Sequence, residues 1–232
     1  MTGPATTPDD DTAARTMSAA AESARYALLR RLAPSMRHHL VVPLQPIGMV
    51  YEIMDRRLRA PEPNLAEIHE GARKINGYAR SALASCVDVV TWLAPDEKSR
   101  ASAADALGEC LALVQTAFTF RGFTLRDELA DGISGEVARS AFRFVVTGAL
   151  TYLSDVHPPP AHITISGKGT SSALVLTLSV APGAGEQGFA TTLGYRPLAW
   201  EDVEALAASE SAEVQREGSS VRISLPWALA SA

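Results

Sequence analysis

The chain has 232 residues, of which 47% are hydrophobic and 20% are charged, and its formal net charge is −5. This composition is ordinary for a globular protein and allows one large domain or two small ones, each with a core. The acidic balance argues against the basic surface that nucleic acids and anionic membranes favour, so we expect no nucleic-acid and no membrane partner.

The start of the chain and its cysteines indicate a cytoplasmic protein. Residues 1–19 have no apolar core and include an acidic triplet, Asp9 to Asp11, so we expect a disordered tail and not a signal peptide. No apolar run approaches the ~20 residues that a membrane span needs. Cys86 and Cys110 lie in apolar helical patterns, and we expect both to be buried, reduced thiols.

Residues 20–96 are predicted to form an antiparallel helical hairpin. From about Ala20 to Arg59, large apolar side chains recur at steps of three or four, as one buried helical stripe requires. They are Leu29, Leu32, Met36, Leu40, Leu44, Ile47, Tyr51, Met54 and Leu58. Pro61 and Pro63 break this pattern, because proline cannot continue a helix. A second stripe then runs from Leu65 to Leu93.

The second helix has its own start and stop signals. Asn64 is a suitable N-cap, and Glu67 stands three residues later in the position of a capping box. Pro95 ends the helix. Two long helices alone bury only one narrow face each, and apolar residues such as Val50 and Val87 flank both stripes. We therefore predict a homodimer in which two hairpins form a four-helix bundle.

His38 is the candidate functional residue of the first helix. It lies two residues from both Met36 and Leu40, so at about 100° per residue it points away from the stripe and toward solvent. The segment His38-His39-Leu40-Val41-Val42-Pro43-Leu44 resembles the phospho-acceptor box of bacterial histidine kinases. In that box a histidine is followed by an acidic residue, leucine, two variable residues, proline and leucine. The resemblance implies that His38 is the phospho-accepting residue and that Pro43 bends the helix just beyond it.

Two positions depart from the family pattern. His39 replaces the acidic residue that can act as a general base, and Val42 replaces the Thr or Asn that can orient water. These departures argue against autokinase and phosphatase activity. Transfer to or from an aspartyl phosphate needs fewer catalytic groups from this chain, because a receiver domain brings its own Mg²⁺ and aspartate. The hairpin then has only to present a neutral, nucleophilic imidazole.

Residues 97–232 show an α/β pattern. Helices are expected at 101–118, 135–153 and 200–209, and strands at 120–129, 162–166, 173–180, 213–216 and 220–225. The order resembles the ATP-binding domain that follows the hairpin in histidine kinases. The final helix, strand, glycine turn and last strand, which run from Asp202 to Pro226, carry this resemblance most clearly.

The residues that bind ATP in that family are missing. Gly148 stands where the family has a Mg²⁺-binding asparagine. No Asp lies near the segment from Val180 to Gly185, where the family has an adenine-recognising Asp. The glycine-rich phosphate loop is reduced to Gly188 and Gly194. Each lost contact is worth on the order of 1–3 kcal/mol, so we expect no ATP, no resident metal and no other cofactor.

The resemblance thus implies an α+β protein of two domains: the hairpin 20–96, then a degenerate, Bergerat-like α/β sandwich at 97–232. The leading interpretation is a histidine phosphotransferase that relays phosphoryl groups between receiver-domain aspartates through His38. The alternatives are a pseudokinase scaffold that binds a response regulator or a kinase, and an active histidine kinase. We expect the receiver to dock on the exposed face around His38, formed by Met36, Arg37, His39, Val41, Val42 and Gln45.

Overall fold

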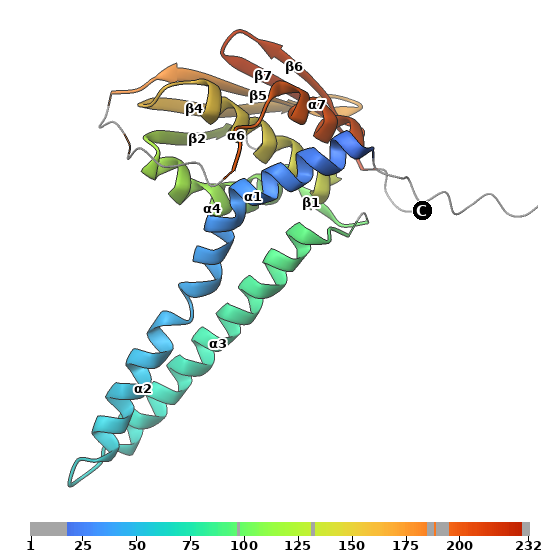
Figure 1. The fold of residues 1–232 in the computed structure, drawn as a ribbon. Helices are drawn as coiled ribbons and strands as arrows, with labels where there is room; N and C mark the ends of the chain where they lie inside the picture. The colour runs from blue at the N-terminus through green and yellow to red at the C-terminus, as the bar shows by residue number, and fades with distance from the viewer. Residues whose placement is uncertain (1–17, 97, 131–132, 185–187, 189–194, 229–232) are drawn as a thin grey trace, which may run out of the picture.

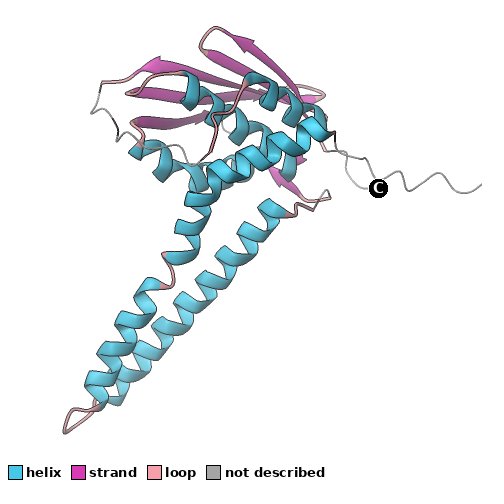
Figure 2. Ribbon diagram, viewed as in Figure 1, coloured by secondary structure: helices cyan, strands magenta, loops and turns pink. Residues whose placement is uncertain are grey.

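A two-helix stalk and an α/β head make up the molecule, as Figures 1 and 2 show. The computed structural model describes residues 18–96, 98–130, 133–184, 188 and 195–228. The stalk consists of α2 (Gln45–Leu58) and α3 (Leu65–Leu93), and the head consists of the elements from β1 to β7. The first helix, α1 (Ala19–Val41), runs from the head into the stalk (Figure 1).

The stalk confirms the predicted antiparallel hairpin. Asn64 caps α3, because its side chain accepts hydrogen bonds from the backbone N–H groups of Ala66 and Glu67. Gly71 on α3 faces Met54 on α2, and a Cβ at this glycine would lie only 2.4 Å from Met54 Cγ. The two helices therefore approach closely at the far end of the stalk.

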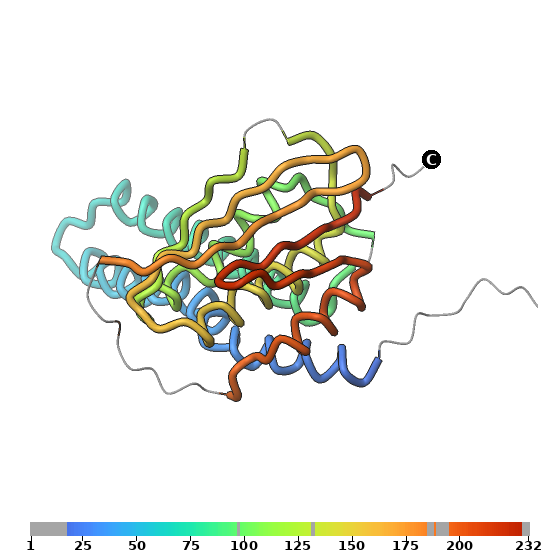
Figure 3. The backbone as a smooth tube through the Cα atoms, turned by 90° about the horizontal axis from the view of Figure 1, so that it is seen from above, coloured from blue at the N-terminus to red at the C-terminus, as the bar shows by residue number. Residues whose placement is uncertain are grey.

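Most of α1 packs on the head, which sequence periodicity did not predict. Its buried residues are Ala21, Ala24, Ala27, Leu28, Leu32, Ser35 and Met36. The larger apolar ones share one buried cluster with helices α4, α6 and α7 of the head, and Figures 1 and 3 show α1 lying along α7. The core thus crosses the boundary expected at residues 96 and 97, although a division of the chain into domains there stays a prediction.

The head follows the predicted element order except for two short paired strands, β1 and β3, that were not predicted. Its elements are β1 (Arg100–Ser102), α4 (Ala103–Phe120), β2 (Phe123–Leu129), β3 (Glu136–Ala138), α5 (Arg139–Ala141), a π-helical turn η1 (Phe142–Val146), α6 (Thr147–Val156), β4 (Ala161–Gly169), β5 (Ala173–Pro182), α7 (Trp200–Ser209), β6 (Glu213–Glu217) and β7 (Ser220–Pro226). The expected helix at 135–153 instead begins as a strand, because Glu136–Ala138 pairs with β1.

Within the described residues, the main sheet has five strands in the order β2-β4-β5-β7-β6. The β2–β4 pair is parallel, and the other pairs are antiparallel. Side chains alternate between the faces, as strand geometry requires, so one face is apolar and packs on the helices of the head. The large buried residues of the central strands are Ile163, Ile165, Leu174, Leu176, Leu178, Val221, Ile223 and Leu225. The view in Figure 3 shows the strands running over this helical layer.

The two cysteines lie in different environments. Cys110 on α4 is buried, as predicted, but Cys86 on α3 is exposed, so the prediction of a buried thiol at that position is wrong for the single chain. Both are free thiols. Among the described residues, no helix combines the length and the apolar character that crossing a membrane requires.

Candidate functional site around His38

His38 lies in the last turn of α1, where its imidazole is exposed. The helix ends three residues later at Val41, and the backbone N–H of Val42 still donates to the carbonyl of His38 at 3.0 Å. An exposed imidazole can be reached by another protein, and its nitrogen can act as a nucleophile when it is neutral.

The helix breaks just beyond His38, as the sequence predicts. Residues 42–44 separate α1 from α2, and Pro46 stands in the first turn of α2. Pro43 has no N–H, so it cannot donate to the carbonyl of His39 one turn earlier. The break gives the chain a change of direction beside His38, which is visible where α1 meets α2 in Figure 1.

His39 contacts the head through one ring nitrogen. Its side chain is half-buried, and Nε2 lies 3.0 Å from the carbonyl oxygen of Ala112 in α4. A carbonyl oxygen can only accept a hydrogen bond, so Nε2 must carry the proton that is donated. The two neighbouring histidines therefore differ in environment, because His38 is open to solvent while Nε2 of His39 is occupied.

The predicted docking residues form an exposed surface with two exceptions, Met36, which is buried, and His39, which is half-buried against α4. Arg37 and Gln45 are exposed, and so are Val41 and Val42, with exposed fractions of 41% and 46%. Leu44 also belongs to this surface, since it is 50% exposed. Met36 does not, because it is only 6% exposed and packs into the core of the head. The placement of Met36 on the exposed face is therefore wrong.

Two ion pairs that the sequence reasoning missed hold α1 on the head. Arg25 pairs with Glu210, which follows α7, and Arg31 pairs with Asp155 near the end of α6. Leu28 lies between these pairs along α1 and is fully buried. The short side chains of Ala21 and Ala24 are the feature of the sequence that could have indicated this packing. Small residues on one helical face allow another helix to approach closely.

Apolar side chains fill the space beside Gly148, the position compared above with the Mg²⁺-binding asparagine of histidine kinases. Gly148 is buried in α6, and a Cβ there would lie 2.7 Å from Leu206 Cδ1 on α7 and 3.9 Å from Leu28 Cδ2 on α1. An asparagine at this position would therefore clash with the helix packing. Phe144 and Leu178 are fully buried in the same cluster, while Gly194 lies outside the described residues.

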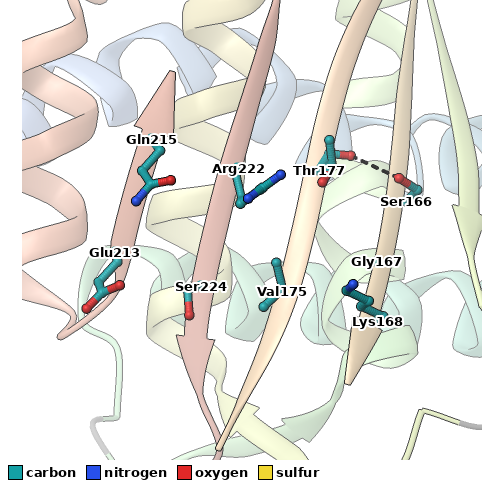
Figure 4. Close-up of a pocket in the computed structure, with 9 residues that line it drawn as sticks. All are labelled: Ser166, Gly167, Lys168, Val175, Thr177, Glu213, Gln215, Arg222 and Ser224. Atoms are coloured by element: carbon teal, nitrogen blue, oxygen red, sulfur yellow. Dashed lines mark hydrogen bonds between the residues drawn. The ribbon is translucent and has the colours of Figure 1, made fainter. Parts of the chain in front are cut away.

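A polar depression lies on the opposite, uncovered face of the sheet (Figure 4). It has a volume of about 560 Å³, and its lining side chains come from four neighbouring strands. Two cross-strand rows form it, and these are Ser166, Thr177, Arg222 and Gln215, then Lys168, Val175, Ser224 and Glu213. The lining includes short Ser, Thr and Val side chains, and the depression lies on the face of the sheet away from the helices of the head.

Two other histidines of the described residues, His69 and His157, give no alternative centre. His69 is exposed on α3 beside Glu70, and the hydrogen bond from Arg73 lowers the pKa of that glutamate. The Nδ1 atom of His157 lies 3.0 Å from the carbonyl oxygen of Leu153, where it closes the end of α6. Among the described residues, no group of three or more His, Cys, Asp and Glu side chains is arranged to hold a metal ion.

Comparisons with known proteins place histidine kinases among the structural neighbours. A histidine kinase from Burkholderia phymatum STM815 is 14% identical with a TM-score of 0.42, over 87% of this chain and 99% of the other. A bacterial phosphotransferase is 14% identical with a TM-score of 0.39, over 90% of this chain and 98% of the other. The histidine kinase ThkA, in complex with the response regulator TrrA, is 15% identical with a TM-score of 0.37, over 88% and 62% of the two chains.

No protein-family model matches the sequence. The search of curated proteins found no match either. The identities and TM-scores of the structural neighbours are low, so the function has to be argued from the residues of this chain.

Proposed function

We propose that this protein is a histidine phosphotransferase in which His38 carries a phosphoryl group between the aspartates of receiver domains. The observation that supports this most directly is the exposure of His38 in the last turn of α1, beside a surface of exposed apolar and polar residues. The Nε2 atom of the neighbouring His39 is hydrogen-bonded to Ala112, so His38 is the more accessible imidazole of the two.

The reaction needs few groups from this chain. A ring nitrogen of neutral His38 attacks the phosphorus of an aspartyl phosphate on the receiver. The P–N bond forms as the P–O bond to the aspartyl carboxylate breaks, and the carboxylate leaves as an anion. The exposed ring then releases its extra proton to solvent. The reverse sequence passes the group to another aspartate, and the Mg²⁺ that neutralises the phosphoryl oxygens belongs to the receiver.

ATP is not part of this proposal, because the packing at Gly148 opposes a nucleotide there. The side chain that would ligate Mg²⁺ is absent, and Leu28 and Leu206 fill the space beside the backbone. Nucleotide binding would require α1 to leave the head, which would break two ion pairs and expose buried apolar side chains. Burial of each such side chain is worth roughly 1.5–3 kcal/mol.

We also propose that two copies pair through the stalk. One face of α3 is apolar and open in the single chain, and Leu83, Val90 and Leu93 on it have exposed fractions of 66%, 57% and 60%. These residues follow one another at steps of seven and three, the spacing of a helical seam. Cys86 lies in the same seam. A second copy would cover this face and form a four-helix bundle.

The proposal places the protein in the reducing cytoplasm, which agrees with both cysteines being free thiols. A panel of phosphorylated receiver domains from the same genome, incubated with the protein, tests the function. We expect label to move to the wild type and not to a His38→Ala variant. His69→Ala is the matched control, since it removes another exposed histidine of the bundle. Binding of receivers without transfer of label would favour a scaffold instead.

A further inference from the structure

We infer that His39 is a positioning residue, whose hydrogen bond to the backbone of α4 fixes the direction in which His38 presents its ring. This inference rests on the proposed function. It gives a role to the residue at which the chain departs from the acidic residue expected after the phospho-acceptor.

The end of α1 has few other anchors. Met36 is the last buried residue of α1, and Val50 in α2 is the next buried residue along the chain. Within the described segment 37–49 every residue is half-buried or exposed. The contact between His39 and Ala112 lies in this gap and joins α1 to the middle of α4.

Two prolines weaken the backbone around the same turn. Pro34 lies inside α1, and Pro43 follows its end. Neither residue has an N–H, so the carbonyls of Arg30 and His39 each lack the helical hydrogen bond that they would otherwise accept. Segments with few buried contacts and missing backbone bonds open at low free-energy cost. A side-chain bond to a stable helix therefore matters more here than in a regular helix.

The geometry links His39 to His38 through the backbone. Neighbouring residues on a helix point about 100° apart. When His39 is held against α4, His38 is held pointing away from the head, toward solvent. Without the bond, the turn is free to rotate or fray, and a receiver docked beside it meets the ring in many orientations. Phosphoryl transfer between two folded proteins is sensitive to such misplacement.

The experiment compares four variants with the wild type. His39→Gln keeps an N–H donor at a similar reach, while His39→Asn carries the same amide one methylene shorter, and His39→Phe keeps a ring without a donor. His38→Ala is the negative control. Each protein receives label either from a phosphorylated receiver domain or from phosphoramidate, a small phosphoryl donor that approaches from any direction. Phosphohistidine is mapped by mass spectrometry, and folding is checked by circular dichroism.

We expect His39→Asn and His39→Phe to lower the maximum rate of transfer from the receiver roughly three- to tenfold, the factor that one hydrogen bond supplies. In these two variants, the receiver concentration at half-maximal rate should change less than about twofold. The rate at which phosphoramidate labels His38 should also change less than about twofold. His39→Gln should transfer at close to the wild-type rate. Equal rates in His39→Asn and the wild type would overturn the positioning role alone. A wild type that takes label from no receiver would instead overturn the proposed function, and the positioning role with it.

Discussion

Arg31 on α1 forms a bidentate ion pair with Asp155 near the end of α6, with both N–O distances at 2.6 Å. The two side chains are 6% and 1% exposed. Asp155 also accepts hydrogen bonds from the side chain of Arg121 and from the backbone N–H of Leu198. One buried carboxylate therefore ties α1 to the end of α4 and to the segment that leads into α7.

Removal of this carboxylate should destabilise the fold strongly. In Asp155→Ala, two guanidinium groups lose their buried partner, so we expect the free energy of unfolding to fall by about 3–5 kcal/mol. Urea denaturation measures the change. Asp55→Ala is the control, because Asp55 forms an exposed pair with Arg59, and its loss should cost less than about 1 kcal/mol. Similar small losses in both variants would show that Asp155 does not hold α1 on the head.

Gly148→Asn restores the residue type that a nucleotide site would need, but it should fail to create one. Its Cβ would meet Leu206 Cδ1 at 2.7 Å, so we expect a loss of about 1–3 kcal/mol in stability from overpacking. We expect no gain in ATP binding, as judged by thermal shift. In a Leu206→Ala background the asparagine should cost less, since the contact that it strains is gone. If Gly148→Asn left the stability of the otherwise wild-type protein unchanged, this would contradict the filling of the space beside Gly148 by Leu206.

The pair between Asp202 and Arg196 predicts a dependence of stability on pH. The hydrogen bond from Arg196 lowers the pKa of the Asp202 carboxyl, and a bond from the backbone N–H of Ala199 acts in the same direction. A lowered pKa in the folded state stabilises the protein above the unfolded pKa of about 4, and this stabilisation is lost as the pH falls through the folded pKa.

Asp202→Asn should therefore be less stable than the wild type at neutral pH, by less than about 1 kcal/mol because Arg196 is partly exposed. The difference should shrink as the pH is lowered below 4, which urea denaturation across this range would reveal. A difference that stays constant with pH would mean that the pair contributes no pH-dependent stability.

The reactivities of the two cysteines test the fold and the stalk interface together. Burial raises the pKa of the Cys110 thiol to about 12, so it should react with iodoacetamide only after unfolding. Cys86 is exposed in the single chain but lies in the open seam of α3, so a second copy should protect it. We expect slow alkylation of Cys86 at high protein concentration and faster alkylation on dilution. If Cys86 is alkylated as fast as a free thiol at every protein concentration, two copies do not pair through this face.

Local signals predicted much of the fold correctly. Asn64 and the prolines around it placed the start of α3, and Pro43 placed the break after His38, because these residues act on the backbone through their own chemistry. The strands at the end of the chain were likewise found from alternation. Such features depend on residues close in sequence.

The errors concern contacts between distant segments. Met36 was placed on the exposed face around His38 and Cys86 in a buried apolar stripe, yet Met36 is buried by the head, while Cys86 is exposed on the single chain. Periodicity identifies an apolar face but does not say what covers it. The stretch Glu136–Ala138 was taken as helix because its strand character depends on pairing with Arg100–Ser102, which lies more than thirty residues earlier. The bond between His39 and Ala112 could not be predicted for the same reason.

Phosphorylation of His38 by a receiver domain tests the central claim most directly. The protein is mixed with a phosphorylated receiver, quenched under alkaline conditions that preserve phosphohistidine, digested and mapped by mass spectrometry. We predict phosphate on His38 in the wild type, no phosphate on His39 or His69, and loss of transfer in His38→Ala without loss of the fold. Phosphate on another residue, or transfer that survives His38→Ala, would contradict it.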